Sequence, residues 1–98
     1  MQLDDAINSL ESCPAAYVLA GSDQQYLYKG ACRDLARRMK DHRAGRVSRT
    51  KNRRPLALVY FEYFNTYTDA RKRELFLKTG AGRHWLMSKL AGTTNFPP

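Results

Sequence analysis

The segment from 17 to 42 constrains this chain most, because two strand-like stretches there lead directly into a basic helix. Residues 15–20 and 26–30 carry the apolar and aromatic side chains typical of strands. Between them, residues 21–25 are Gly, Ser, Asp and two Gln, which favour a chain reversal. The segment therefore predicts a β-hairpin followed by a helix.

The hairpin brings two tyrosines close together. Because alternate side chains of a strand share a face, Tyr17 and Tyr28 can lie on the same face, within reach of a common ligand. Gly30 has no Cβ, so a backbone or a phosphate can approach it closely. Strands are rich in tyrosine, however, and both residues could equally be ordinary core aromatics with bonded hydroxyls.

The helix after the hairpin combines an apolar stripe with basic residues. Leu35, Met39 and His42 are spaced by four and three, and Asp34 is a suitable first residue. Arg38 flanks this stripe, where its guanidinium could bind a phosphate in a half-buried cleft. The alternative for His42 is a structural histidine at the edge of the core.

The segment from 43 to 55 contains no acidic residue and predicts a flexible cationic loop that binds phosphates without reading bases. Its cations are Arg43, Arg46, Arg49, Lys51, Arg53 and Arg54. The net charge of +8 also favours a polyanionic partner, which could be DNA, RNA or an anionic membrane surface. The membrane is the weaker option, because the cations do not alternate with bulky apolar residues. A merely soluble basic protein is the remaining alternative.

The sequence as a whole predicts a single domain of the α+β class over residues 1–98. Its elements follow in the order β-β-α-β-α-α, preceded by a short helix. The further elements are a helix over 3–12, a strand over 56–64, a helix from Thr68 or Asp69 to Gly80, a helix over 83–90 and a tail over 91–98. The core of the domain spans about 14–90.

Glu74 is the carboxylate with the most unusual predicted position. It shares a helix face with Ala70 and Leu77, where a charge is costly unless it meets a cation or a metal. The alternative is a surface ion pair with Lys78 or Arg71.

The cysteines and the N-terminal residues bear on localisation. Cys13 and Cys32 do not have the spacing of a metal site and are interpreted as free thiols in a reducing compartment. The chain starts without the features of a signal peptide and has no apolar run of membrane-spanning length. These features predict a cytoplasmic protein.

The ordered set of these residues resembles the GIY-YIG nuclease domain over about 14–90. Ala15-Ala16-Tyr17 stands at the GIY motif and Tyr28-Lys29-Gly30 at the YIG motif. Arg38 and His42 on the next helix, and Glu74 on a later one, complete the similarity. The chain is most similar to small stand-alone members related to the nuclease domain of bacterial excision repair.

The resemblance implies a three-stranded antiparallel sheet with flanking helices and the metal-assisted hydrolysis of DNA. It implies that Glu74 holds one Mg²⁺ or Mn²⁺ and that Arg38 stabilises charge on the phosphoryl oxygens. By the same resemblance, Tyr17 orients or deprotonates the attacking water or relays its proton to a base. Tyr28 and His42 then bind the phosphate or assist the proton transfer.

Nucleic-acid contacts are predicted at Gly30 and at five cations of the basic segment. These are Arg46, Arg49, Lys51, Arg53 and Arg54. The alternatives to a DNA endonuclease are a non-catalytic nucleic-acid-binding module on the same scaffold and an enzyme that acts on RNA.

The chain departs from the family pattern at three places. Ala15 and Ala16 replace the Gly-Ile of the first motif, with little expected effect because both residues are small. Lys29 replaces the central Ile of the second motif, and a lysine facing the helices has to extend its amine outward. For the late Asn that many members carry, this chain offers only Thr79, Ser88 or Asn95, and that role stays open.

Overall fold

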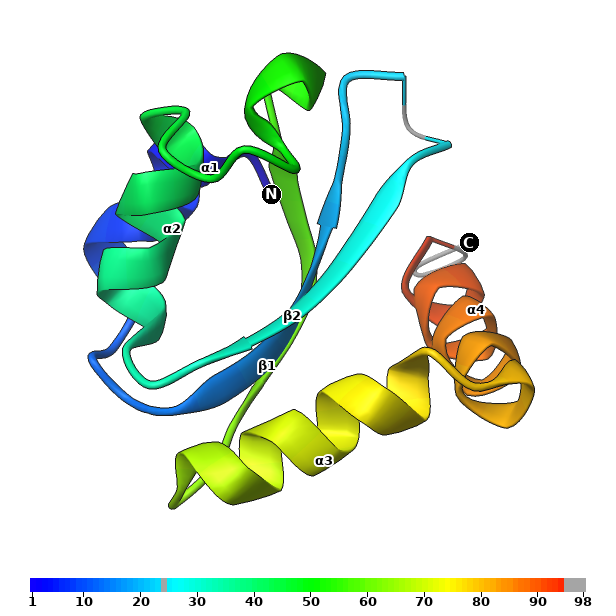
Figure 1. Ribbon diagram of the computed structural model, residues 1–98. Helices are drawn as coiled ribbons and strands as arrows, with labels where there is room; N and C mark the ends of the chain where they lie inside the picture. Colours follow the sequence, from blue (N-terminus) through cyan, green and yellow to red (C-terminus); the bar gives the residue numbers. More distant parts are fainter. Residues whose placement is uncertain (24, 95–98) are drawn as a thin grey trace.

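A three-stranded antiparallel sheet forms the centre of the molecule (Figure 1). The computed structural model describes residues 1–23 and 25–94. The strands are β1 (Ala15–Ala20), β2 (Leu27–Cys32) and β3 (Ala57–Tyr63), and β1 lies between the other two. Tyr17 pairs with Gly30 of β2 and with Phe61 of β3. The predicted three-stranded antiparallel sheet and the predicted β-β-α-β-α-α order of elements along the chain are confirmed.

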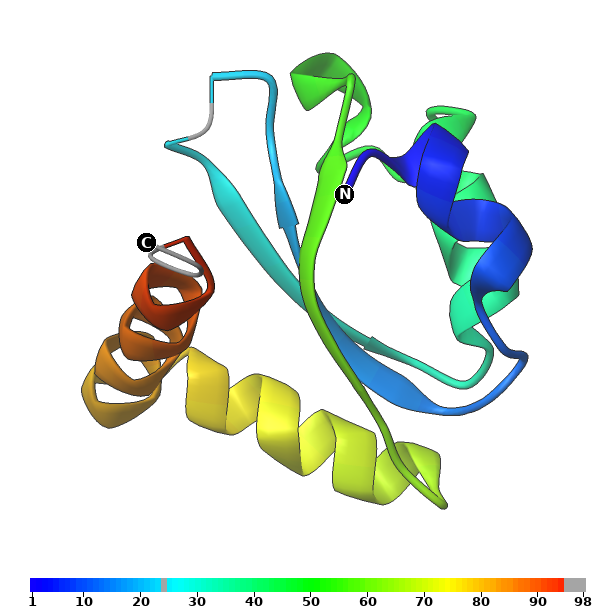
Figure 2. The same cartoon turned by 180° about the vertical axis from the view of Figure 1, so that it is seen from behind.

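Helices cover both faces of the sheet, as the front and back views show (Figures 1 and 2). The helices α1 (Leu3–Ala6) and α2 (Leu35–Arg43) pack on one face, together with the 3-10 turn η1 (Ile7–Ser9). The helices α3 (Tyr67–Leu77) and α4 (Gly80–Thr94) pack on the other. Over the described residues, no helix has the length and apolar character that crossing a membrane would require.

The central strand β1 is buried along its whole length and supplies both halves of the core. Tyr17 and Leu19 face α2, where they join the cluster that contains Leu35. Val18 faces the opposite way and packs with Leu77 of α3. A strand covered on both faces is apolar at every position, which explains the unbroken AAYVLA sequence.

The extent of the first helix and the start of α3 (Tyr67–Leu77) differ from the prediction. The helix expected over 3–12 consists only of the short α1 and η1, which Leu10 ends with extended backbone. Helix α3 begins at Tyr67, because the Thr66 hydroxyl accepts a 3.2 Å hydrogen bond from the backbone N–H of Asp69 and caps the helix.

The C-terminal half also differs. Helix α3 ends at Leu77 and α4 begins at Gly80, earlier than the predicted start at 83. The tail predicted from 91 is wrong as far as Thr94, because α4 continues through Gly92 despite the low helix propensity of glycine. The rest of that predicted tail, 95–98, lies outside the described residues.

Candidate active site

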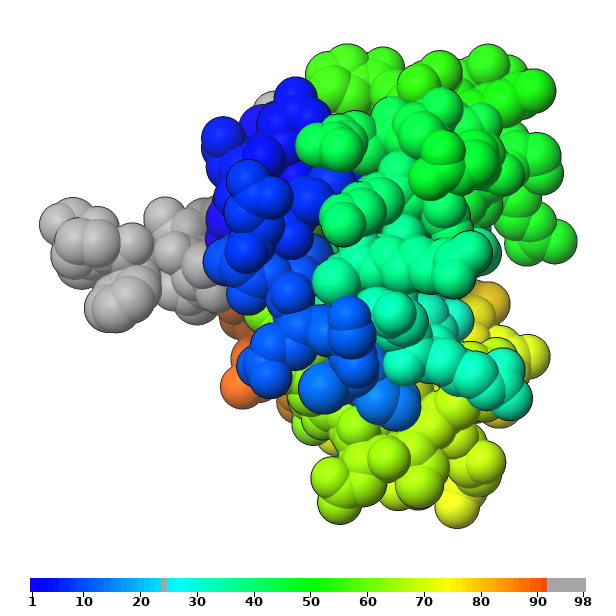
Figure 3. Space-filling view, turned by 90° about the vertical axis from the view of Figure 1, so that its left-hand side faces the viewer, coloured from blue at the N-terminus to red at the C-terminus, as the bar shows by residue number. Residues whose placement is uncertain are grey.

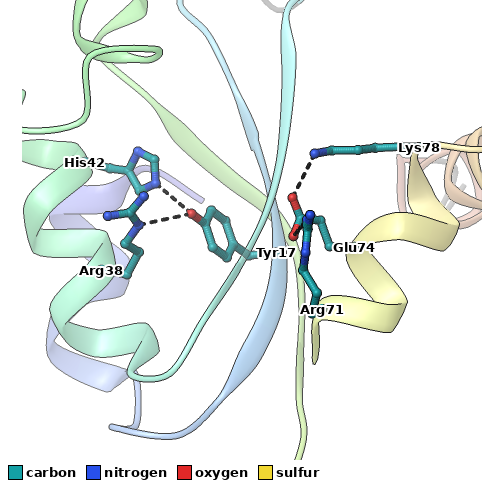
Figure 4. Close-up of polar contacts among 6 residues, drawn as sticks. All are labelled: Tyr17, Arg38, His42, Arg71, Glu74 and Lys78. Atoms are coloured by element: carbon teal, nitrogen blue, oxygen red, sulfur yellow. Dashed lines mark hydrogen bonds and ion pairs between the residues drawn. The ribbon is translucent and has the colours of Figure 1, made fainter. Parts of the chain in front are cut away.

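Tyr17, Arg38 and His42 form one hydrogen-bonded network between β1 and α2 (Figure 4). The Tyr17 hydroxyl oxygen lies 2.8 Å from His42 Nε2. Arg38 Nε donates to the same hydroxyl over a longer 3.5 Å. Because residues 38 and 42 are one helical turn apart, α2 presents both side chains toward the single phenol of β1.

Tyr28 completes this cluster through ring contacts. Its ring centroid lies 6.2 Å from that of Tyr17 and 5.4 Å from that of His42. Tyr17 and His42 are fully buried, whereas Tyr28 is only partly buried. Tyr28 is therefore the phenol of the cluster that is accessible to a ligand.

The absence of a side chain at Gly30 leaves room for the ring of Tyr17 on the neighbouring strand. A Cβ at position 30 would lie 2.5 Å from the ring carbon Cζ and from the hydroxyl oxygen of Tyr17. The close approach that the sequence suggested at this glycine is thus made by the Tyr17 ring. Gly30 is buried, and a contact between it and a phosphate stays a prediction.

Burial sets the protonation of the network. Burial, and then the nearby charge of Arg38, lower the pKa of His42 to about 4. Burial raises the pKa of Tyr17 well above its ordinary value, although Arg38 opposes this. At neutral pH the network therefore consists of a neutral imidazole, a protonated phenol and a guanidinium cation.

Glu74 lies on α3 and is also buried, with an exposed fraction of 7%. Its two carboxylate oxygens accept from Arg71 Nη1 at 2.6 Å and from Lys78 Nζ at 2.8 Å (Figure 4). In the described part of the chain, no hydrogen bond or ion pair joins Glu74 to Tyr17, Tyr28 or Arg38. Both partners named as alternatives from the sequence thus bind the carboxylate at the same time.

Glu74 is the residue to test as a ligand of a divalent cation. Carboxylate oxygen is the donor that Mg²⁺ and Mn²⁺ prefer, so Glu74 is chemically suitable. Among the described residues, no group of three or more His, Cys, Asp or Glu side chains could hold a metal ion. Water and substrate oxygens would have to fill the remaining positions.

Comparison with known proteins identifies the family. The family model described as the GIY-YIG catalytic domain matches residues 13–87. The chain belongs to the GIY-YIG family. This is a family of nucleases, so its membership supports a phosphodiester hydrolase that acts on nucleic acid.

Similar GIY-YIG relatives are small proteins named UPF0213. One from Listeria monocytogenes serotype 4b is 44% identical over 63 residues, which cover 63% of this chain and 70% of the relative. Another, from Haloquadratum walsbyi, is 39% identical over 64 residues, covering 64% of this chain and 71% of the relative. No solved structure matches the chain. The names of these relatives give no substrate.

The cationic segment of this GIY-YIG chain is anchored, in contrast to the flexible loop that we expected. Val47 and Thr50 are buried within it, and it contains the 3-10 turn η2 (Lys51–Arg53). It is tied to the β1–β2 connection, because Tyr26 Oη donates to the Arg49 carbonyl at 3.1 Å. Figure 3 looks onto α2 and this segment, which together form a continuous outer surface.

Three of the five predicted phosphate-binding cations of the segment already have partners within the chain. Arg46 pairs with Asp41 at 2.8 Å and Arg53 with Asp23 at 3.4 Å. Arg54 donates from Nε to the Lys51 carbonyl and from Nη1 to the Arg43 carbonyl. An added Cβ at Gly45, where φ is +79°, would lie 2.7 Å from the Arg54 guanidinium carbon. Arg54 therefore stabilises the turn after α2, and its binding of nucleic acid stays a prediction.

Arg49 and Lys51 are the other two cations of that set. Both side chains are exposed on the outer surface of the segment. Because exposed Arg and Lys side chains can donate hydrogen bonds to phosphate oxygens, these two residues are the simplest candidates for phosphate contacts. This role stays a prediction.

The structure shows where residues at the departures from the GIY-YIG pattern lie. Lys29 is partly buried on the α3 side of β2, where burial, and then the charges of Arg83 and Lys78, lower its pKa. Thr79 connects α3 with α4, since its hydroxyl donates to the Phe76 carbonyl at 2.7 Å and accepts from Gly82 N–H at 3.0 Å. Ser88 is exposed on α4, and Asn95 lies outside the described residues.

Sequence reasoning missed one member of the cluster. Thr50 is fully buried, and its hydroxyl oxygen lies 2.8 Å from His42 Nδ1. In the sequence it stands among exposed cations, and a lone threonine there gives no signal of burial.

Proposed function

We propose that this protein is a divalent-metal-dependent endonuclease that hydrolyses DNA phosphodiester bonds. The observation that carries the proposal is the network of Arg38, Tyr17 and His42 with Tyr28 packed beside it. Branched and nicked DNA are the first substrates to consider, in keeping with a role in repair. Since both cysteines are free thiols, we further propose that it acts in the reducing cytoplasm.

Arg38 is the group we assign to the phosphate. It is only partly buried, so its guanidinium can donate to phosphoryl oxygens while Nε contacts Tyr17. Donors fixed in this way stabilise the charge that grows on the phosphate in the transition state. The Tyr17 oxygen orients the guanidinium, and the neutral His42 in turn holds the Tyr17 hydroxyl.

Tyr28 is the phenol we assign to the attacking water or to a phosphate oxygen. Tyr28 is a partly exposed residue and can therefore contact a ligand, whereas Tyr17 is fully buried. This division of roles revises the sequence-based expectation, in which Tyr17 itself met the water. The Tyr17 side chain then acts by positioning Arg38.

Glu74 is the residue we assign to the metal. A bound divalent cation would supply a water of lowered pKa and positive charge next to the phosphate. For the carboxylate to ligate this cation, Lys78 or Arg71 has to move from the oxygen it now contacts. Both are about half exposed, with side-chain exposures of 47% and 45%, so neither is held rigidly by packing.

The test is a cleavage assay on branched, nicked and duplex DNA with Mg²⁺ or Mn²⁺. Arg38→Ala should abolish cleavage, whereas Arg37→Ala, which removes an equal charge from an exposed position of the same helix, should not. Glu74→Gln should abolish it as well, with the exposed Glu11→Gln as its control. Cleavage that persists in Arg38→Ala and Glu74→Gln would refute the assignment.

The alternative is a non-catalytic nucleic-acid-binding module. It is favoured by one observation, that both oxygens of Glu74 are already engaged by cations. It would be established by tight DNA binding that is independent of metal, is unchanged in Glu74→Gln and is accompanied by no cleavage. Running the same assay on structured RNA distinguishes the enzyme that acts on RNA.

A further inference from the structure

The hydrogen bonds around His42 run in a single direction. Arg38 has donors only, so at its contact the Tyr17 oxygen accepts and its own proton must go elsewhere. The other partner of that oxygen is His42 Nε2, which must therefore be the unprotonated nitrogen that accepts it. In a neutral imidazole the proton is then on Nδ1, which faces the Thr50 hydroxyl oxygen at 2.8 Å.

The Thr50 hydroxyl oxygen can accept a hydrogen bond from His42 Nδ1–H, because the hydroxyl donates its own hydrogen to a different acceptor. Its oxygen lies 3.4 Å from the Val47 carbonyl, to which it donates. Thr50 and His42 are both fully buried, so water does not compete for either bond. In the opposite tautomer Nε2 would carry the proton, and the Tyr17 hydroxyl would lose its acceptor.

We infer that Thr50 is a positioning residue, which sets the tautomer of His42 and through it the orientation of Tyr17 and Arg38. The inference rests on the proposed function, since its effect on rate is exerted through Arg38. Thr50 does not touch the phosphate and acts through three hydrogen bonds in series.

The location of Thr50 gives this bond a further consequence. It lies in the cationic segment, directly between the exposed Arg49 and Lys51. A nucleic acid bound by those two side chains would therefore contact the same short segment that holds His42 through Thr50. The cations that we expect to bind the nucleic-acid backbone and the threonine that orients His42 thus belong to the same cationic segment.

The first experiment measures the tautomer directly by ¹⁵N NMR of the imidazole in the wild-type protein at neutral pH. We expect Nδ1 to be protonated and Nε2 to be an unprotonated acceptor. Protonated Nε2 would overturn the inference, whether or not the protein cleaves DNA. The titratable and charged groups facing His42 are Tyr17 from β1, Tyr28 from β2, and Arg38 and Asp41 from α2 itself.

The second experiment uses three variants of the segment. Thr50→Val keeps the shape but removes the hydroxyl, and we expect cleavage roughly tenfold slower with a DNA Kd changed by less than about twofold. Thr50→Ser restores the hydroxyl and should recover the rate to within about twofold. Ser48→Ala removes an exposed hydroxyl two residues away and should leave the rate unchanged.

The outcomes separate the two proposals. If the wild-type protein does not cleave, the proposed function fails while the tautomer still tests Thr50. If it cleaves and Thr50→Val is as fast as wild type with the same tautomer, the positioning role is refuted. If Thr50→Val does not fold, the positioning role is tested by the tautomer of the wild-type protein and by the rate of Thr50→Ser. A cleavage rate far below that of the wild type in a folded Thr50→Ser would contradict the role.

Discussion

Acidification should destabilise the folded protein through one buried histidine. His42 has a pKa of about 4 in the fold, against about 6.5 in an unfolded chain. Between these values the unfolded chain binds a proton that the folded chain does not, so the free energy of unfolding falls as the pH falls. From about pH 7 to about pH 5 the loss from this group is about 2 kcal/mol, at ~1.4 kcal/mol per pKa unit.

The assay is urea unfolding followed by circular dichroism at a series of pH values. His42→Gln lacks the titrating group, and its unfolding free energy should depend less on pH by that amount, whatever its absolute stability. His84→Gln removes an exposed histidine and should behave like wild type. Parallel pH dependences for wild type and His42→Gln, or an NMR titration of His42 near its ordinary pKa, would refute the reasoning.

Three other perturbations test the site and the surface. Gly30→Ala should cost about 1–3 kcal/mol in urea unfolding, because its Cβ meets the tyrosine ring across from it. Gly80→Ala, with no atom within 4 Å of the added Cβ, should stay within about 0.5 kcal/mol; equal costs would contradict this. Lys78→Met removes a half-exposed competitor of Glu74 and should tighten Mn²⁺ binding about two- to fivefold by calorimetry. Unchanged affinity would show that the ion pair does not compete. Arg49→Gln should lower the slope of log K against log salt for DNA binding by about 0.9 if it contacts one phosphate, and an unchanged slope would exclude that contact.

The sheet could be predicted because its signal is local. The first strand was predicted at the bounds observed for β1, and alternation suggested that Tyr17 and Tyr28 share a face, where their rings lie 6.2 Å apart. The boundaries of helices were less accurate, since they depend on single caps. The Thr66 hydroxyl begins α3 before the residues that the sequence suggested, and nothing in the pattern ranks one threonine above another.

The site itself was predictable where chemistry and periodicity agree. Burial of Glu74 follows from its helix face, and its two cations are one turn away, Arg71 within α3 and Lys78 directly after its last residue. The distances from Glu74 to the residues of the hairpin, in contrast, depend on how α3 crosses the sheet. The residue pattern gives no information on the angle and position at which α3 packs across the sheet.

The basic segment shows why a charge count alone misleads. Seven described residues separate His42 from Thr50, yet the two meet, because α2 ends and the chain turns back at Gly45. That turn needs a positive φ at Gly45 and donors for the last helical carbonyls. Backbone N–H groups of the turn donate to the carbonyls of Asp41 and His42, and Arg54 donates to the carbonyl of Arg43. A cation that looks like one more phosphate ligand is thus a structural residue. A neutral threonine between two exposed cations contacts the buried imidazole, because the turn that Arg54 stabilises carries it inward.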